Sequence, residues 1–197
     1  MPKQVDIVAQ KQAIADAAIQ VIGETGLDAT RLRDVAAAAG VTTGAVTHYF
    51  DGKDEVLIAA LEELVRRILD PDVWRRPPGL SLKDALIALC GELLPLDDET
   101  RGEWRVWLAF WSRAIHTPRL AEIHRGYYVR ITDALSETLM THGGLEPARA
   151  NLIADAIVAA VDGVGVRATV EPDQWPAARQ RQTLAALITP LLPNAQS

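Results

Sequence analysis

The stretch from Leu32 to Tyr49 holds side chains whose types and spacing fit one chemistry, the reading of base edges in DNA. Its second half gathers hydroxyls, an imidazole and a glycine within two helical turns, and Gly40 separates it from the first half. Such groups near the start of a helix can approach base edges in a major groove, and a glycine allows close contact. The stretch therefore predicts a helix-turn-helix with an exposed set of Thr42, Thr43, Gly44, Thr47 and His48.

The charge of the chain requires that any DNA contact depend on local geometry. The formal net charge is −6, and residues 1–56 hold five Lys or Arg against eight Asp or Glu, a net charge of −3. Broad non-specific binding of nucleic acid favours a strongly basic chain instead. Predicted helix N-termini at Thr30 to Leu32, at Thr42 to Thr43 and near Lys53 can offer unpaired N–H groups to phosphates.

A second group of candidate residues is aromatic. Trp104, Trp107 and Trp111 share one face of a predicted helix, and Tyr127 and Tyr128 lie on the next one. Such rings can bind a flat apolar ligand or a quaternary ammonium group, or they can be packed core, or one tryptophan can line a pocket while the others pack. These interpretations stay open. The candidate effector-binding residues are Cys90, Trp104, Trp107, Phe110, Trp111, His116, His124, Tyr127 and Tyr128.

Other classes of function find no support in the residues. His116 and His124 are too far apart to share a helical turn, and no cluster has metal-ligand spacing. A phosphate loop, a nucleophile elbow and a Cys-His signature are also absent, so we expect no enzyme, cofactor or metal site. The lone Cys90 favours a buried thiol, with a redox sensor as the alternative. Neither a membrane span nor a signal peptide is evident, so we expect a cytoplasmic protein.

Helical periodicity positions these groups, and no useful period-2 alternation occurs, so the predicted fold class is all-α. An apolar face that starts at Ile14 ends at Gly26, a natural stop. Ser81 to Asp84 and Thr100 to Glu103 have the spacing of capping boxes, and Thr117-Pro118 resembles an N-cap followed by proline. The remaining helices are expected at about residues 32–39, 43–49, 53–69, 147–170 and 174–192, with an irregular segment at 70–79.

The predicted helix from Pro147 to Val170 has a wide apolar face that includes small residues. Such a helix packs against more than one neighbour, and a second copy of the chain can supply one of them. Asp162 interrupts the apolar run, either as a polar contact across a dimer or as a local hydrogen bond. The predicted dimer interface comprises Ile153, Ile157, Val161, Val164, Leu184, Leu187 and Ile188.

The segment Tyr49-Phe-Asp-Gly-Lys53-Asp-Glu-Val-Leu57 closely resembles the end of the DNA-binding domain in the TetR family of bacterial regulators. The resemblance extends back to Lys11-Gln-Ala-Ile14, over about 50 residues. It implies that the exposed set named above faces bases or nearby phosphates, while Tyr49 and Lys53 hold the DNA backbone. Thr47 departs from the family, since many members have tyrosine there, and the N-terminal arm has few basic residues. Thr30, Arg31, Tyr49 and Lys53 complete the candidate DNA-binding set.

Residues 43–54 are most similar to the subgroup of choline-responsive repressors of betaine synthesis, as are Trp107 to His116 and Val161 to Arg167. The resemblance implies a helix-turn-helix domain at 1–52 and an effector-binding and dimerisation domain at 53–197. It also implies a homodimeric repressor that a small molecule of unknown identity releases from a pseudo-palindromic DNA operator. Alternatives with the same fold are an activator and a binding module that has lost DNA recognition.

Overall fold

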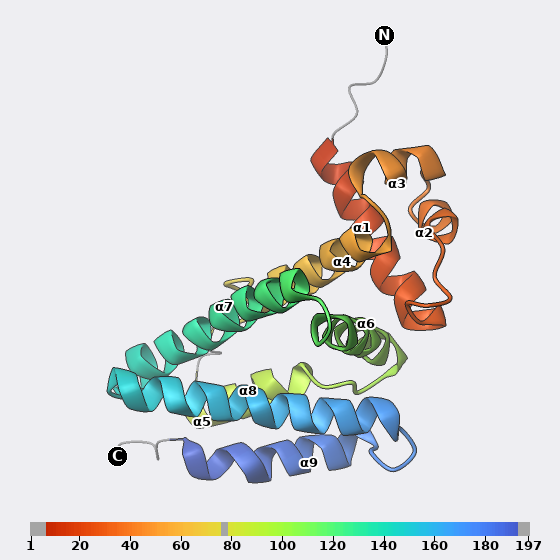
Figure 1. Cartoon of the computed structure of the whole chain (residues 1–197). Coiled ribbons are helices and arrows are strands. Elements are labelled where there is room, and N and C mark those ends of the chain that lie inside the picture. The colour runs from red at the N-terminus through yellow and green to blue at the C-terminus, as the bar shows by residue number, and fades with distance from the viewer. Residues whose placement is uncertain (1–6, 76–78, 193–197) are drawn as a thin grey trace.

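Figure 1 shows the computed structural model of the chain, which describes residues 7–75 and 79–192. Every regular element within those ranges is helical, which confirms the predicted all-α class. Pro77 and Pro78 of the expected irregular segment lie outside the described residues. The elements are α1 (Ile7–Thr25), α2 (Leu32–Ala38), α3 (Thr43–Tyr49), α4 (Lys53–Ile68), α5 (Leu82–Glu92), α6 (Asp98–Ala114), α7 (Pro118–Gly143), α8 (Pro147–Val170), α9 (Ala177–Ile188) and the 3-10 turn η1 (Thr189–Leu191).

Helices α1 to α3 form the helix-turn-helix that the sequence predicts. Gly40 has a φ of +66°, and the N–H of Val41 donates to the carbonyl of Ala36 at 2.9 Å, which closes α2 in a left-handed turn. The side chains of Val35 and Val46 are fully buried between the helices. Helix α1 is already helical at Ile7, the first described residue, ahead of the apolar stripe that starts at Ile14. The stripe misses this first part because Ile7 and Val8 face outward.

Helix α4 connects these helices to the rest of the molecule. Its buried residues Val56, Leu57 and Leu61 join one core with residues of α1, α2, α3, α6 and α7. Helix α6 lies directly across α1, where Gly23 of α1 meets Gly102 of α6. The predicted domain boundary after residue 52 coincides with the start of α4, and it stays a prediction.

Two helix starts differ from the sequence expectations for local reasons. Asp97, not Thr100, caps α6, because its carboxylate accepts from the Thr100 N–H at 2.8 Å while the Thr100 hydroxyl accepts from the Asp97 N–H at 3.1 Å. Helix α9 starts after Pro176, which lacks an N–H and disfavours helical geometry at the residue before it. The predicted caps of α5 and α7, Ser81 and Thr117, are both N-cap residues in the structure, although Thr117 makes no side-chain cap bond.

Helices α7 and α8 run antiparallel, and α9 lies against α8 on the side away from α1 to α3 (Figure 1). A second core joins α5, α8 and α9 with Trp104 of α6. In the described part of the chain, no helix is long and apolar enough to cross a membrane.

Candidate functional site

A cavity of about 200 Å³ opens among helices α4 to α8, between the two cores. Its wall is mostly apolar, with polar groups at a few positions. The lining residues are Leu64, Arg67, Ile68, Trp74, Cys90, Glu92, Leu93, Thr100, Glu103, Trp104, Trp107, Trp111, Tyr128, Ile131, Leu135, Ile157, Val158, Val161 and Asp162.

Five aromatic residues line the cavity, and four of them, on α6 and α7, contact one another. Trp111 lies 6.2 Å from Trp104 and 6.3 Å from Trp107 between ring centroids, and Trp107 meets Tyr128 edge-on at 6.2 Å. The indole N–H of Trp104 donates to the carbonyl of Leu93 at 2.8 Å, and the far side of its ring rests on the backbone of Gly165. The three tryptophans therefore line the cavity and also pack in the core, so lining and packing are not alternatives, and ligand binding stays a prediction.

Asp162 is one of three carboxylates in the lining, and it is the one that forms no ion pair in the described residues. Its side chain accepts a hydrogen bond from the Tyr128 hydroxyl at 2.9 Å, and no Lys or Arg in the described residues pairs with it. Burial raises the pKa of Asp162 to about 6 and, together with the nearby carboxylate, raises the pKa of Tyr128. Of the two interpretations of Asp162, the structure shows a hydrogen bond within the chain. A cation in this cavity would find an acceptor and π faces together.

The rim of the cavity carries further charges. Arg67 of α4 and Glu103 of α6 form an ion pair at 3.0 Å there, and Glu92 pairs with Arg181 at 2.7 Å. Burial raises the pKa of Glu103, an effect that Arg67 opposes. The lining thus holds three carboxylates and one guanidinium, which favours cationic over anionic ligands.

The structure brings together five of the nine candidate effector residues, namely Cys90, Trp104, Trp107, Trp111 and Tyr128. Burial raises the pKa of the Cys90 thiol to about 12, so the thiol is neutral. The other four do not line the cavity. Phe110 is fully buried against Tyr127, His124 stacks on Tyr128 from outside the lining, and His116 is exposed at the turn between α6 and α7.

Helix α3 presents its predicted polar set outward. Thr43, Gly44, Thr47 and His48 are exposed, and Thr42 caps the helix by accepting from the Ala45 N–H at 3.1 Å. Among the described residues, a Cβ at Gly44 would meet only the Thr42 hydroxyl, at 3.8 Å, so none of them requires glycine there.

The other predicted DNA-contact residues differ in how their side chains are held. Arg31 is exposed, whereas Thr30 is only 2% exposed and its hydroxyl donates to the carbonyl of Gly26 at 2.8 Å. The Thr30 side chain therefore holds the loop between α1 and α2 and does not lie on the surface. The Lys53 ammonium donates to the carbonyls of Leu27 and Asp28 at 3.3 and 3.0 Å, and the Tyr49 hydroxyl donates to Gln10 at 2.8 Å.

Six of the seven predicted interface residues are buried within one chain, and only Leu187 is exposed, at 50%. Ile157 and Val161 line the cavity. The apolar periodicity of α8 correctly marked a buried face, but that face packs on α7, α9 and Trp104 of the same chain. The residues that α8 and α9 expose include Leu152, Ala159, Gly163 and Leu187.

Comparisons with known proteins agree over both halves of the chain. The family model for bacterial regulatory proteins of the tetR family matches residues 14–60, and the model for the C-terminal part of BetI-type transcriptional repressors matches residues 82–193. The regulator BetI of Burkholderia thailandensis is 31% identical over 173 residues, which cover 85% of each chain.

Two solved structures share the fold. A transcriptional regulator from Rhodococcus sp. Rha1 has a TM-score of 0.78 at 34% identity, covering 92% of this chain and 95% of that one. A regulator from Saccharomonospora viridis in complex with choline has a TM-score of 0.76 at 22% identity, covering 92% and 96%.

The chain therefore belongs to the TetR family of bacterial transcriptional regulators, with a C-terminal part of the BetI type. Its relatives are regulators and not enzymes. The family confirms the predicted class of function, a DNA-binding transcriptional regulator with a helix-turn-helix. Members bind operator DNA, usually as dimers, and respond to small molecules.

Four charged residues of the cavity lining were absent from the predicted set, namely Arg67, Glu92, Glu103 and Asp162. Asp162 interrupts an apolar run in the sequence, and that polar break is the signal that could have placed it in the cavity. Arg67 and Glu103 gave no such signal, because their meeting depends on how α4 crosses α6.

Proposed function

We propose that this chain is a homodimeric repressor that leaves a pseudo-palindromic operator when a small organic cation enters the tryptophan-lined cavity. The observation that carries the proposal is the half-buried Asp162 carboxylate, which accepts a hydrogen bond from Tyr128 and pairs with no cation of the described chain. A carboxylate removed from water is costly unless an opposite charge compensates it. A bound cation would supply that charge and gain further from the surrounding rings.

The chemistry of the cavity favours a quaternary ammonium group over a primary amine. A quaternary ammonium group makes no strong hydrogen bonds to water, so its transfer from water to a cavity lined by indole rings costs little free energy. The regulator from Saccharomonospora viridis that shares this fold was crystallised with choline, which makes choline a suitable first probe.

The surface proposed to meet DNA is the start of α3 together with Arg31. Thr43, Gly44, Thr47 and His48 would face the major groove, while Tyr49 and Lys53 would approach phosphates. Because Lys53 already donates to two carbonyls, one of its three N–H groups is the most that could reach a phosphate without breaking these bonds. A regulator of this kind would act in the cytoplasm, where bacterial DNA lies.

The proposed dimer pairs α8 and α9 with their copies through the residues they expose. Leu152, Ala159 and Gly163 follow one another at spacings of seven and four, so they form a stripe along α8. Small residues in that stripe allow two helices to approach closely, and Leu187 of α9 extends the apolar surface. Pairing would present two copies of α3 to half-sites about 34 Å apart.

Fluorescence anisotropy with labelled DNA from beside the gene tests the proposal. We expect sequence-selective binding that choline weakens, and a loss of the choline effect in Asp162→Asn but not in Asp133→Asn, an exposed carboxylate on α7 outside the cavity lining. Thr43→Ala should weaken DNA binding, whereas Thr141→Ala, at an exposed position on α7, should not. Unchanged affinity in Thr43→Ala would refute the DNA surface.

Light scattering tests the dimer. A mass of two chains at micromolar concentration is expected, and Gly163→Arg should reduce it towards one chain. A monomeric wild type would refute the pairing.

A further inference from the structure

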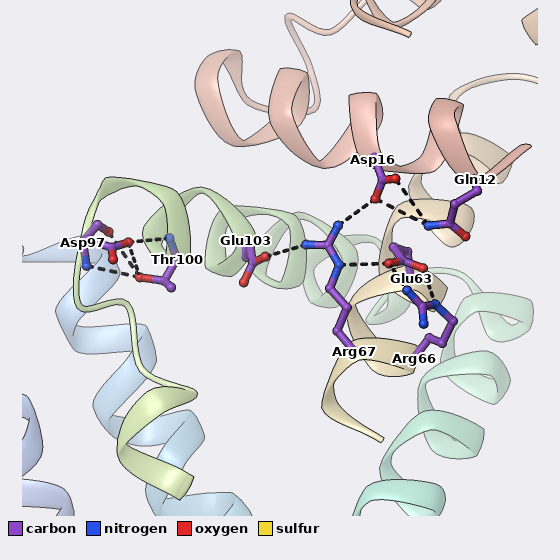
Figure 2. A network of polar contacts seen from close by, with 8 residues as sticks. All are labelled: Gln12, Asp16, Glu63, Arg66, Arg67, Asp97, Thr100 and Glu103. Atoms are coloured by element: carbon purple, nitrogen blue, oxygen red, sulfur yellow. Dashed lines mark hydrogen bonds and ion pairs between the residues drawn. The ribbon is translucent and has the colours of Figure 1, made fainter. Parts of the chain in front are cut away.

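One guanidinium joins three helices at the edge of the cavity. Figure 2 shows Arg67 of α4 between Asp16 of α1, Glu63 of α4 and Glu103 of α6. Its nitrogens lie 2.6 Å from Asp16, 2.9 Å from Glu63 and 3.0 Å from Glu103. Arg67 therefore forms three ion pairs. The pair with Glu63 stays within α4, whereas the pairs with Asp16 and Glu103 connect α4 to α1 and to α6.

The three carboxylates are not equivalent. Glu63 is 5% exposed and also takes two hydrogen bonds at 2.7 Å from Arg66. Hydrogen bonds from the Arg66 side chain lower the pKa of Glu63 to about 2, so this carboxylate stays charged and holds one edge of Arg67 in place. Asp16 and Glu103 have no hydrogen bond to Arg66, and both side chains are more exposed than Glu63.

Arg67 and Glu103 are also part of the cavity lining, whereas Asp16 is not. Asp16 lies on α1, the first helix of the DNA-binding domain, on the side that faces α4 (Figure 2). The two outer bonds of Arg67 thus connect the wall of the ligand cavity to the domain that carries α3.

From this arrangement we propose that Arg67 transmits occupancy of the cavity to the DNA-binding domain through Glu103 and Asp16. This inference rests on the proposed function, in which the effector is a cation. A cation in the cavity attracts the Glu103 carboxylate and repels the Arg67 guanidinium, so it weakens the pair that they form. Arg67 then shifts relative to Asp16, and α1 loses a contact that fixes its place on α4.

Linkage requires the effect to be mutual, so operator binding must also disfavour the cation, and coupling of this kind typically amounts to roughly 5- to 150-fold in affinity. Neutralising Glu103 without any ligand should imitate part of the effect. The test can therefore be made on the full-length protein before an effector is known.

A double-mutant cycle on operator affinity tests the path. Glu103→Gln should weaken operator binding by at least roughly fivefold in the wild-type background and by less than about twofold in the Asp16→Asn background. Glu99→Gln, which changes an exposed charge on the same helix, should have no effect in either background. Thermal melts of each variant show whether the fold is intact.

Equal effects of Glu103→Gln in both backgrounds, or no effect in either, would overturn the proposal. A second arm uses choline at a concentration that saturates its fluorescence change. If choline weakens operator binding as strongly in Asp16→Asn as in wild type, the path through Arg67 is wrong while the proposed function stands. If choline does not bind but the cycle shows coupling, the ligand class is wrong and the path stands.

Discussion

The crossing of α1 and α6 yields an unusual prediction, in which the same substitution at two facing glycines has opposite effects. A Cβ added to Gly23 would lie 2.8 Å from the Cα of Gly102 and 3.0 Å from its carbonyl carbon and oxygen. A Cβ added to Gly102 would meet only the Cα of Gly23, at 3.7 Å, which is ordinary contact. The atoms in the way at Gly23 are backbone, so a side-chain rotation cannot relieve the clash.

The two effects can be sized separately. Alanine favours a helix over glycine by about 1 kcal/mol, so Gly102→Ala should stabilise the protein by up to about that amount. Gly23→Ala gains the same term, but overpacking typically costs about 1–3 kcal/mol, and the upper half of that range applies where only backbone can move. We therefore expect a net loss of about 1–2 kcal/mol for Gly23→Ala.

Thermal unfolding followed by circular dichroism measures both variants. For a chain of this size about 1 kcal/mol corresponds to roughly 2–4 °C, so the two midpoints should differ by several degrees in opposite directions from wild type. Gly23→Ala should also change operator affinity, because relief of the clash moves α1 away from α6 and disturbs the bond from Arg105 to the Gly23 carbonyl, 2.7 Å long. Equal midpoints for the two variants would show that the helices do not cross as closely as described.

Three further predictions concern the cavity and α3. Because burial raises the pKa of Asp162 to about 6, its carboxylate is charged at pH 7.5 and largely protonated at pH 5. Choline affinity, measured by a tryptophan-fluorescence titration, should therefore fall roughly tenfold from pH 7.5 to pH 5. An equally steep fall in Asp162→Asn would contradict this assignment. Gly44→Ala should leave the melting temperature unchanged or higher while weakening operator binding roughly tenfold, and full operator affinity would show that DNA does not approach there. Gly165→Ala places a Cβ 2.0 Å from the Trp104 ring, so it should lower the free energy of unfolding in urea by about 2–4 kcal/mol and reduce choline binding. A variant with wild-type stability and choline binding would refute the packing described.

Much of the fold could be predicted because its boundaries depend on neighbouring residues. Gly40 and Thr42 mark the turn and the start of α3 through local backbone geometry, and the structure confirms both. The start of α6 was misplaced by three residues because Asp97 and Thr100 both have side chains that can cap a helix, and sequence spacing alone does not decide between them.

The site was predicted less completely, because its charged groups meet only through tertiary packing. Helical spacing placed the three tryptophans on one face, which is a local property. It gave no information on whether α8 would bring Asp162 to that face or whether α4 would bring Arg67 to Glu103. For the same reason, apolar periodicity found the buried side of α8 but could not tell a partner in the same chain from one in a second chain.

Because Trp104 packs against Gly165, one wall of the cavity is more rigid than the others. On one side the indole ring rests on the backbone of α8 and is tied to Leu93, so it has no room to retreat. On the other side the wall consists of side chains on α4, among them Leu64 and Ile68, whose helix also packs on α1. A ligand that needs more space therefore gains none at Trp104. Where α4 supplies that space, its displacement reaches α1, because the two helices pack together.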